Sequence, residues 1–368
     1  MKLSLKLPLR AALASCVAAA VMAAGGAAAA PSVIKNRSIG YVLTDEYWAI
    51  YQTAEGKDEC PQGLQKMGPR EQFRAMFPED GTKRTVVETQ LMREAQIWNP
   101  TDDYKEQFPF PEAGGKYSYG VNLNGTFGPN DFTSPDGEKG IKNQLYRALG
   151  CNEHFRGPDG VQFALTNKMV RIVPYNRLVL ELTNVDDLGN DPDVNVTIER
   201  GLDTLLTDGT GDLIIPGGTQ RLDGRFAKKY IQRLHGKIVN GMLMTDQTDI
   251  RIMHTQNDNA SEEFYRAGTF RLKVSEAGAE GILAGYNDID RMYYGMNRNL
   301  GTYFQAYGRL TSQSLYKKLR ELADGYPDPK TGKNTAISSA MTMLFKQVFI
   351  EHPDKEVAEK SSDRAPAR

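Results

Sequence analysis

Cysteine and histidine are scarce in this chain of 368 residues, which contains three of the first and four of the second. Four histidines are too few for a histidine-rich metal centre, and the C-x-x-H run from Cys151 to His154 lacks the second cysteine that c-type haem attachment requires. The chain also lacks the G-x-S-x-G, P-loop and H-E-x-x-H motifs of common hydrolases and NTPases. Glycosidases remain open, because their paired carboxylates need no fixed spacing in sequence.

An excess of positive charge is also missing. The 45 lysines and arginines are balanced by 46 aspartates and glutamates, which gives a formal net charge of -1. Without a basic field, nucleic acid is not an expected partner. Glycine (35) and proline (18) are close to average usage and 40% of the residues are hydrophobic, so the composition excludes a collagen-like or wholly disordered chain and indicates a globular one.

The first thirty residues have the pattern of a secretory signal peptide. Three basic residues among the first ten precede an uncharged stretch, Ala11 to Ala30, that ends in small residues. We therefore expect residues 1–30 to be removed, and the mature protein to be periplasmic or secreted without a transmembrane span. A retained membrane anchor is one alternative. A lipoprotein is another, since the four residues ending at Cys16 have the form of a lipobox and would place a lipid anchor there.

Two cysteines remain once Cys16 is removed with such a peptide. Cys60 and Cys151 are then an even pair in an oxidising compartment, and the sequence predicts a disulfide between them. This bond would close a loop of about 90 residues. The alternative is a reactive thiol at Cys151.

Hydrophobic periodicity divides the mature chain into regions. Residues 31–150 indicate a mixed α/β region, and expected elements there are a strand over 39–51 and helices over 69–77, 85–98 and 141–149. Residues 151–285 alternate apolar and polar side chains, for example over 178–183, 194–199 and 270–275. Such alternation is typical of antiparallel strands with one buried face.

The last part of the chain changes to a helical period. Over residues 286–352 apolar side chains recur at three- and four-residue steps, including Ile337, Met341, Leu344 and Val348. Residues 353–368 form a mixed-charge tail that we expect to be disordered. The sequence thus predicts an α+β fold with an antiparallel β-sandwich or jelly-roll-like core over 151–285, an α/β N-terminal region and a helical C-terminal region.

An aspartate-rich run between two of these strands provides candidate metal ligands. Asp186, Asp187, Asp191 and Asp193 supply hard oxygen atoms of the kind that calcium prefers. The run lacks the EF-hand spacing, and the same residue types make ordinary turns, so a turn without metal is the alternative. Calcium is the cofactor to consider, and no cofactor is firmly implied.

Two further groups are candidate functional residues. Glu153 and His154 could act as acid and base if a substrate group came within hydrogen-bond reach. Four tyrosines of a glycine-containing segment form either a binding face or the packing face of a docked helix. These tyrosines are Tyr293, Tyr294, Tyr303 and Tyr307.

These observations predict an exported binding or interaction protein rather than a recognisable enzyme. Its expected ligand is a carbohydrate or another small molecule, because β-sandwiches often bind such ligands through edge loops and aromatic platforms. One alternative is an extracytoplasmic hydrolase that uses carboxylates or His154. Another is an envelope scaffold or lipoprotein that binds a protein of the cell envelope.

Overall fold

A computed structural model describes residues 33–53, 56–64, 92–93, 96–97, 111–157, 160–256, 259–300 and 312–353. The expected signal peptide with Cys16, the expected helix over 69–77, and all but the first residue of the expected disordered tail over 353–368 lie outside the described residues. Residues 33–368 belong to one compact unit. None of the described helices is both long and apolar enough to cross a membrane.

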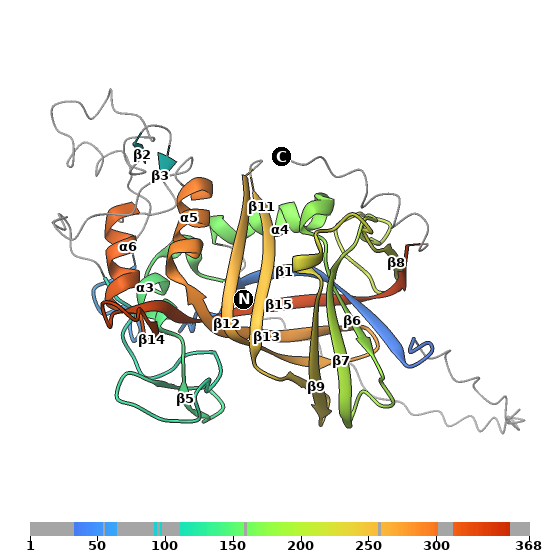
Figure 1. The fold of residues 1–368 in the computed structure, drawn as a ribbon, viewed down its shortest axis with the longest axis horizontal. Helices are drawn as coiled ribbons and strands as arrows, with labels where there is room; N and C mark the ends of the chain where they lie inside the picture. Colours follow the sequence, from blue (N-terminus) through green and yellow to red (C-terminus); the bar gives the residue numbers. More distant parts are fainter. Residues whose placement is uncertain are drawn as a thin grey trace, which may run out of the picture. The chain divides into compact units, whose positions relative to one another are not determined.

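Eight antiparallel strands form a closed barrel (Figure 1). Each strand pairs with the next in the order β1-β6-β7-β9-β10-β12-β13-β15, and β15 pairs back with β1. The strands are β1 (Ser38–Trp48), β6 (Leu178–Thr183), β7 (Asp191–Arg200), β9 (Gln232–Val239), β10 (Met242–Thr245), β12 (Asn259–Val274), β13 (Gly278–Asp288) and β15 (Asn334–Glu351).

Shorter elements surround the barrel. Three further strands extend its sheet: β11 (Thr248–Gln256) pairs with β12, whereas β8 (Gly218–Arg221) and β14 (Gly325–Pro327) pair with β15. Two small hairpins are separate, β2 (Met92–Arg93) with β3 (Gln96–Ile97) and β4 (Phe132–Thr133) with β5 (Lys139–Ile141). The described helices are α3 (Gln144–Leu149), α4 (Val161–Ile172), α5 (Ile289–Leu300) and α6 (Ser312–Glu321), and the 3-10 turns are η1 (Glu153–Phe155), η2 (Pro174–Asn176) and η3 (Lys228–Tyr230).

The prediction of a β-sandwich or jelly roll is wrong. The strands expected over 178–183, 194–199 and 270–275 are present in β6, β7 and β12, but they belong to one closed sheet rather than two packed ones. Alternation of apolar and polar residues shows only that one face is buried, and a sandwich and a barrel share this property. What distinguishes them is the pairing of β1 with β15, which no local pattern reveals.

The prediction of a helical C-terminal region is also wrong, because residues 334–351 form the closing strand β15. Every residue from Ala336 to Met341 is buried, so this part of the strand has apolar or small side chains on both faces, and its apolar residues also fit helical spacing. Met341, Met343 and Phe345 belong to the main core, whereas Ala340 and Val348 pack on the outer side. Within the described part of 286–352, only α5 and α6 keep the expected helical form, and they pack against each other (Figure 1).

The N-terminal predictions have a mixed outcome. The strand expected over 39–51 is β1, and the helix expected over 141–149 is present as the shorter α3. The helix expected over 85–98 is wrong where the structure describes that stretch, because β2 and β3 pair there as a hairpin. In a short segment, the spacing of apolar residues cannot distinguish a helix from a hairpin.

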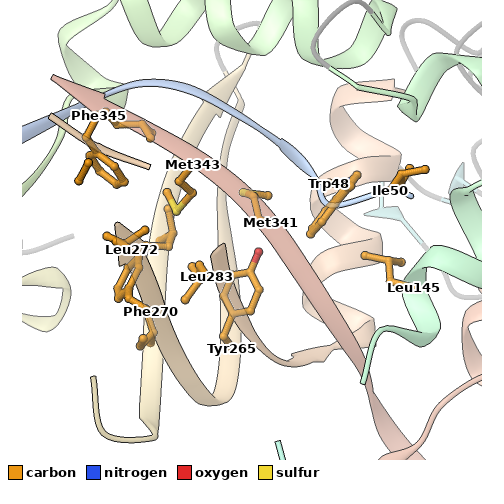
Figure 2. Packing of buried hydrophobic residues seen from close by; sticks show 14 of the residues in the cluster. Trp48, Ile50, Leu145, Tyr265, Phe270, Leu272, Leu283, Met341, Met343 and Phe345 are labelled. Atoms are coloured by element: carbon orange, nitrogen blue, oxygen red, sulfur yellow. The ribbon is translucent and has the colours of Figure 1, made fainter. Parts of the chain in front are cut away.

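Side chains fill the interior of the barrel. Buried residues from all eight strands form one cluster, and Figure 2 shows several of them around Leu283 and Tyr265. An eight-stranded barrel has an interior just wide enough for such packing. The functional surfaces considered below therefore lie outside the barrel. One cluster member from each strand, in the order given above, is Tyr41, Leu180, Val196, Leu234, Leu243, Phe270, Leu283 and Met343.

Residues 56–64 and 111–157, here called the disulfide-linked segment, pack beside the barrel. The predicted bond between Cys60 and Cys151 is confirmed, with their Cα atoms 5.6 Å apart. Leu145 of α3 belongs to the core and lies close to Trp48 at the end of β1 and to Ile50 just after it (Figure 2). The segment is thereby fixed both covalently and by apolar packing.

Candidate functional site

The aspartate-rich run forms a turn whose carboxylates already have partners. Asp191 accepts hydrogen bonds from the backbone N–H groups of Asp186 and Asp193, at 2.6 and 3.1 Å. Asp187 accepts from two backbone N–H groups further along the turn, and Asp186 pairs with Arg37 at 2.8 Å. Asp193 lies 3.1 Å from Nε2 of His235. The four carboxylates thus point to separate partners, as in the turn alternative, and calcium binding stays a prediction.

The other sequence candidates are not brought together. Glu153 is exposed in η1, and the side chain of His154 is not among those that the structure describes. Tyr293 is fully buried in α5, where its ring centroid lies 4.8 Å from that of Tyr316 in α6, whereas Tyr294 is 45% exposed. Tyr303 and Tyr307 lie outside the described residues. Tyr293 is therefore part of the helix packing, and of the two described tyrosines of this group only Tyr294 is exposed.

A different group of tyrosines forms an exposed aromatic surface. The ring of Tyr51 lies 5.9 Å from that of Tyr117 and 5.9 Å from that of Tyr119. Tyr117 and Tyr119 are 49% and 42% exposed. The interplanar angles with Tyr51 are 43° and 59°, so the three rings make a bent surface rather than a flat one. We call these three residues the tyrosine platform.

Backbone hydrogen bonds hold the platform in place. Residues on either side of Tyr117 exchange hydrogen bonds with the backbone of Thr133, because the N–H of Ser118 donates to Thr133 and that of Thr133 donates to Lys116. The side-chain amide of Asn143 donates to the carbonyl of Tyr119 and to that of Ala49, just before Tyr51. One buried amide thus connects the two chain segments that carry the rings.

The environment of the platform is amphipathic. Tyr51 packs against the main core, and the residues beside the rings, Gln52 and Lys116, are exposed. In the neighbouring Tyr47, burial first and the charges of nearby groups second raise the pKa of the phenol above its ordinary value. Exposed rings with polar neighbours can stack on an apolar face of a ligand while hydrogen-bonding to its edges.

A groove on the outside of the barrel is a second candidate binding surface. It has a volume of about 590 Å³, with the side chains of Leu213 and Leu344 among its lining. Among its charged groups, Asp45 pairs with Arg171 at 2.6 Å, and Lys273 lies opposite Glu280 in the β12–β13 ladder. Asp212 and Lys346 also line the groove, which has the size of a ligand site.

Sequence reasoning missed the platform. Tyr117 and Tyr119 lie in a loop-rich stretch, and their spacing of two residues is the only local signal that both rings share a side of an extended chain. Their contact with Tyr51 depends on the disulfide and on Asn143, which bring distant segments together. Comparison with known proteins identifies no relative, since no protein family, no curated protein and no solved structure matches the chain.

Proposed function

We propose that this protein is an exported carbohydrate-binding protein whose ligand stacks on the tyrosine platform. The observation that carries the proposal is the convergence of two exposed tyrosine rings, Tyr117 and Tyr119, on Tyr51. The binding part of the proposal rests on this surface and not on any likeness to a known protein.

The physical basis is the complementarity between an aromatic face and a sugar ring. The face of a tyrosine ring carries partial negative charge, and the C–H groups on one face of a pyranose carry partial positive charge. Tyrosine also loses little conformational entropy on binding, because it has only two side-chain torsions. Here Asn143 and the backbone bonds of Thr133 further limit movement of the platform, which lowers the entropic cost of binding.

Export is the second part of the proposal. It is supported by the signal-like pattern of residues 1–30 and by the Cys60–Cys151 disulfide, a bond that persists in oxidising compartments. Intact mass of the protein purified from its native cells tests it. A mature N-terminus near Ala30 supports export as a processed protein, and an acylated Cys16 identifies a lipoprotein instead. An unprocessed N-terminus with reduced cysteines contradicts export.

A glycan array followed by calorimetric titration tests the binding function. We expect Tyr117→Ala and Tyr119→Ala each to weaken binding of the best glycan at least tenfold, about 1.4 kcal/mol. Tyr294→Ala is the matched control, since Tyr294 is about equally exposed but lies on α5. Asn143→Ala should weaken binding less, because it loosens the platform without removing a ring.

Three outcomes would overturn the proposal. The first is an array without any bound glycan, recorded with and without calcium. The second is a glycan whose affinity is unchanged in both platform variants. The third is loss of binding in Tyr294→Ala alone, which would transfer the binding face to α5.

A further inference from the structure

Two glutamates and a histidine converge on the outer face of the barrel. Glu181 lies in β6, Glu199 in β7, and His352 directly follows β15. Their potential ligand atoms all lie within 4.8 Å of one another, and Nε2 of His352 is 3.0 Å from Oε1 of Glu181. Among the described residues this is the one group of at least three histidine, cysteine or acidic side chains with such spacing.

The strand register explains the convergence. Glu199 lies opposite Val179 in the β6–β7 ladder, so Glu181 and Glu199 are diagonal neighbours on one face. Leu180 and Ile198 between them belong to the core, which places the glutamates outside the barrel. On the other side of β6, β1 pairs with the end of β15, so His352 reaches the same face.

One carboxylate oxygen of this group is buried without a hydrogen-bond partner. The carboxylate of Glu181 is nine-tenths buried and accepts a hydrogen bond from the Ser38 hydroxyl at 3.2 Å. Oε2 of Glu199 is shielded from solvent and has no hydrogen-bond partner. A shielded, unsatisfied carboxylate oxygen beside another carboxylate requires either a proton or a cation.

We propose that Glu181, Glu199 and His352 form a binding site for a divalent zinc ion. One imidazole nitrogen and two carboxylate oxygens are ligands that zinc accepts at about 2.0 to 2.2 Å, and tetrahedral zinc then places them about 3.3 Å apart. The exposed His352 side chain can close the remaining separation, and the Ser38 hydroxyl orients Glu181. Three protein ligands leave the fourth position for water. Calcium does not fit, because it takes six to eight oxygen ligands.

Titration of the untagged, chelator-treated full chain with Zn²⁺ tests the site. We expect one Zn²⁺ to bind with micromolar or tighter affinity, and His352→Ala and Glu199→Gln each to weaken this binding at least tenfold. Ca²⁺ should not compete. Cobalt provides a second readout, because tetrahedral Co²⁺ at the site gives strong visible absorption that both variants should lose.

His235→Ala is the matched control. His235 is likewise exposed and lies beside two carboxylates, Asp246 at 2.8 Å and Asp193 at 3.1 Å, but each ring nitrogen binds a different one. Its removal should leave Zn²⁺ affinity unchanged. The proposal fails if the intact chain binds no Zn²⁺ below 100 µM, if both site variants keep the affinity, or if His235→Ala loses it equally. Because His352 is exposed, His352→Ala should fold normally, which circular dichroism verifies.

Discussion

The barrel and the disulfide-linked segment are stabilised in different ways. In the barrel, each strand finds its hydrogen-bond partners along a neighbouring backbone, and the ladder closes without a free edge. The segment has only the short elements β4, β5, α3 and η1. Side-chain hydrogen bonds and ion pairs therefore stabilise the segment where backbone hydrogen bonds between strands stabilise the barrel.

Those side chains gather around the disulfide. Glu59, next to Cys60, accepts hydrogen bonds from the backbone and the hydroxyl of Thr53 at 2.9 and 2.6 Å. Arg156 pairs with Glu59 at 2.7 Å, and the two side chains are only 7% and 1% exposed. A second shielded pair joins Lys142 to Asp131 at 2.7 Å. Stability of the segment thus depends on a few named residues, whereas stability of the barrel depends on backbone geometry and apolar packing.

Removing the disulfide should have the largest effect. A bond that closes a loop of about 90 residues contributes about 4.6 kcal/mol on the chain-entropy model. We expect Cys60→Ala/Cys151→Ala to lower the free energy of unfolding by about this amount. Amide hydrogen exchange should show lost protection in residues 111–157 first, with the barrel strands retaining more. Equal loss of protection in β6 and β7 would show that the two regions unfold as one.

Breaking the buried ion pair should have the next largest effect. Arg156→Met leaves the Glu59 carboxylate shielded and deprived of its cation, which costs about 3 kcal/mol. Arg156→Met/Glu59→Gln should recover at least half of this loss, because a neutral amide can still accept from the Thr53 N–H and donate to the Thr53 hydroxyl. Urea unfolding of both variants measures the difference. A double variant as unstable as the single one would show that Arg156 acts through its other contacts, which include a hydrogen bond to the carbonyl of Gly150.

The barrel should instead be sensitive to a side chain added at a glycine where two strands lie close together. A Cβ at Gly281 in β13 would overlap the carbonyl oxygen of Arg271 in β12, which cannot rotate away. We expect Gly281→Ala to cost about 2 kcal/mol. Gly209→Ala is the control, since its Cβ would meet open space. If both variants unfold at the same urea concentration, strands β12 and β13 can move apart enough to accept the added Cβ, which contradicts the prediction.

Acid should weaken the segment through Glu59. Burial acts to raise the pKa of this carboxyl, but hydrogen bonds from Thr53 and Arg156 outweigh it and hold the pKa below its ordinary value of 4.5. The unfolded chain therefore takes up the proton first, so the contribution of Glu59 is complete above about pH 4.5 and is lost as pH falls through the lowered value. Stability measured from pH 7 to pH 3 should fall less steeply in Glu59→Gln than in the unchanged chain. Parallel curves would contradict this assignment.

The sequence predicts local features of both regions better than their long-range contacts. Alternation correctly located β6 and β7, and cysteine counting correctly paired Cys60 with Cys151, because each inference needs little beyond local pattern or residue count. The closure of the barrel could not be predicted, since β15 is buried at every residue over 336–341 and gives no period-two signal there, and its pairing with β1 is a long-range contact. The platform and the glutamate–histidine group also depend on pairings between distant segments.

The smallest effect is expected for an exposed ion pair at the end of the barrel. Asp186 pairs with Arg37 at 2.8 Å, a distance close to that of the Glu59–Arg156 pair, but these side chains are 69% and 53% exposed. Solvent screens such a pair, so Asp186→Asn should change the free energy of unfolding by no more than about 0.5 kcal/mol. The same measurement with added Ca²⁺ tests the predicted calcium site. If Ca²⁺ changes the stability of neither the unchanged chain nor Asp186→Asn, the run is a plain turn without calcium. The smaller contribution of the Asp186–Arg37 pair than of the Glu59–Arg156 pair is then explained by its exposure to solvent.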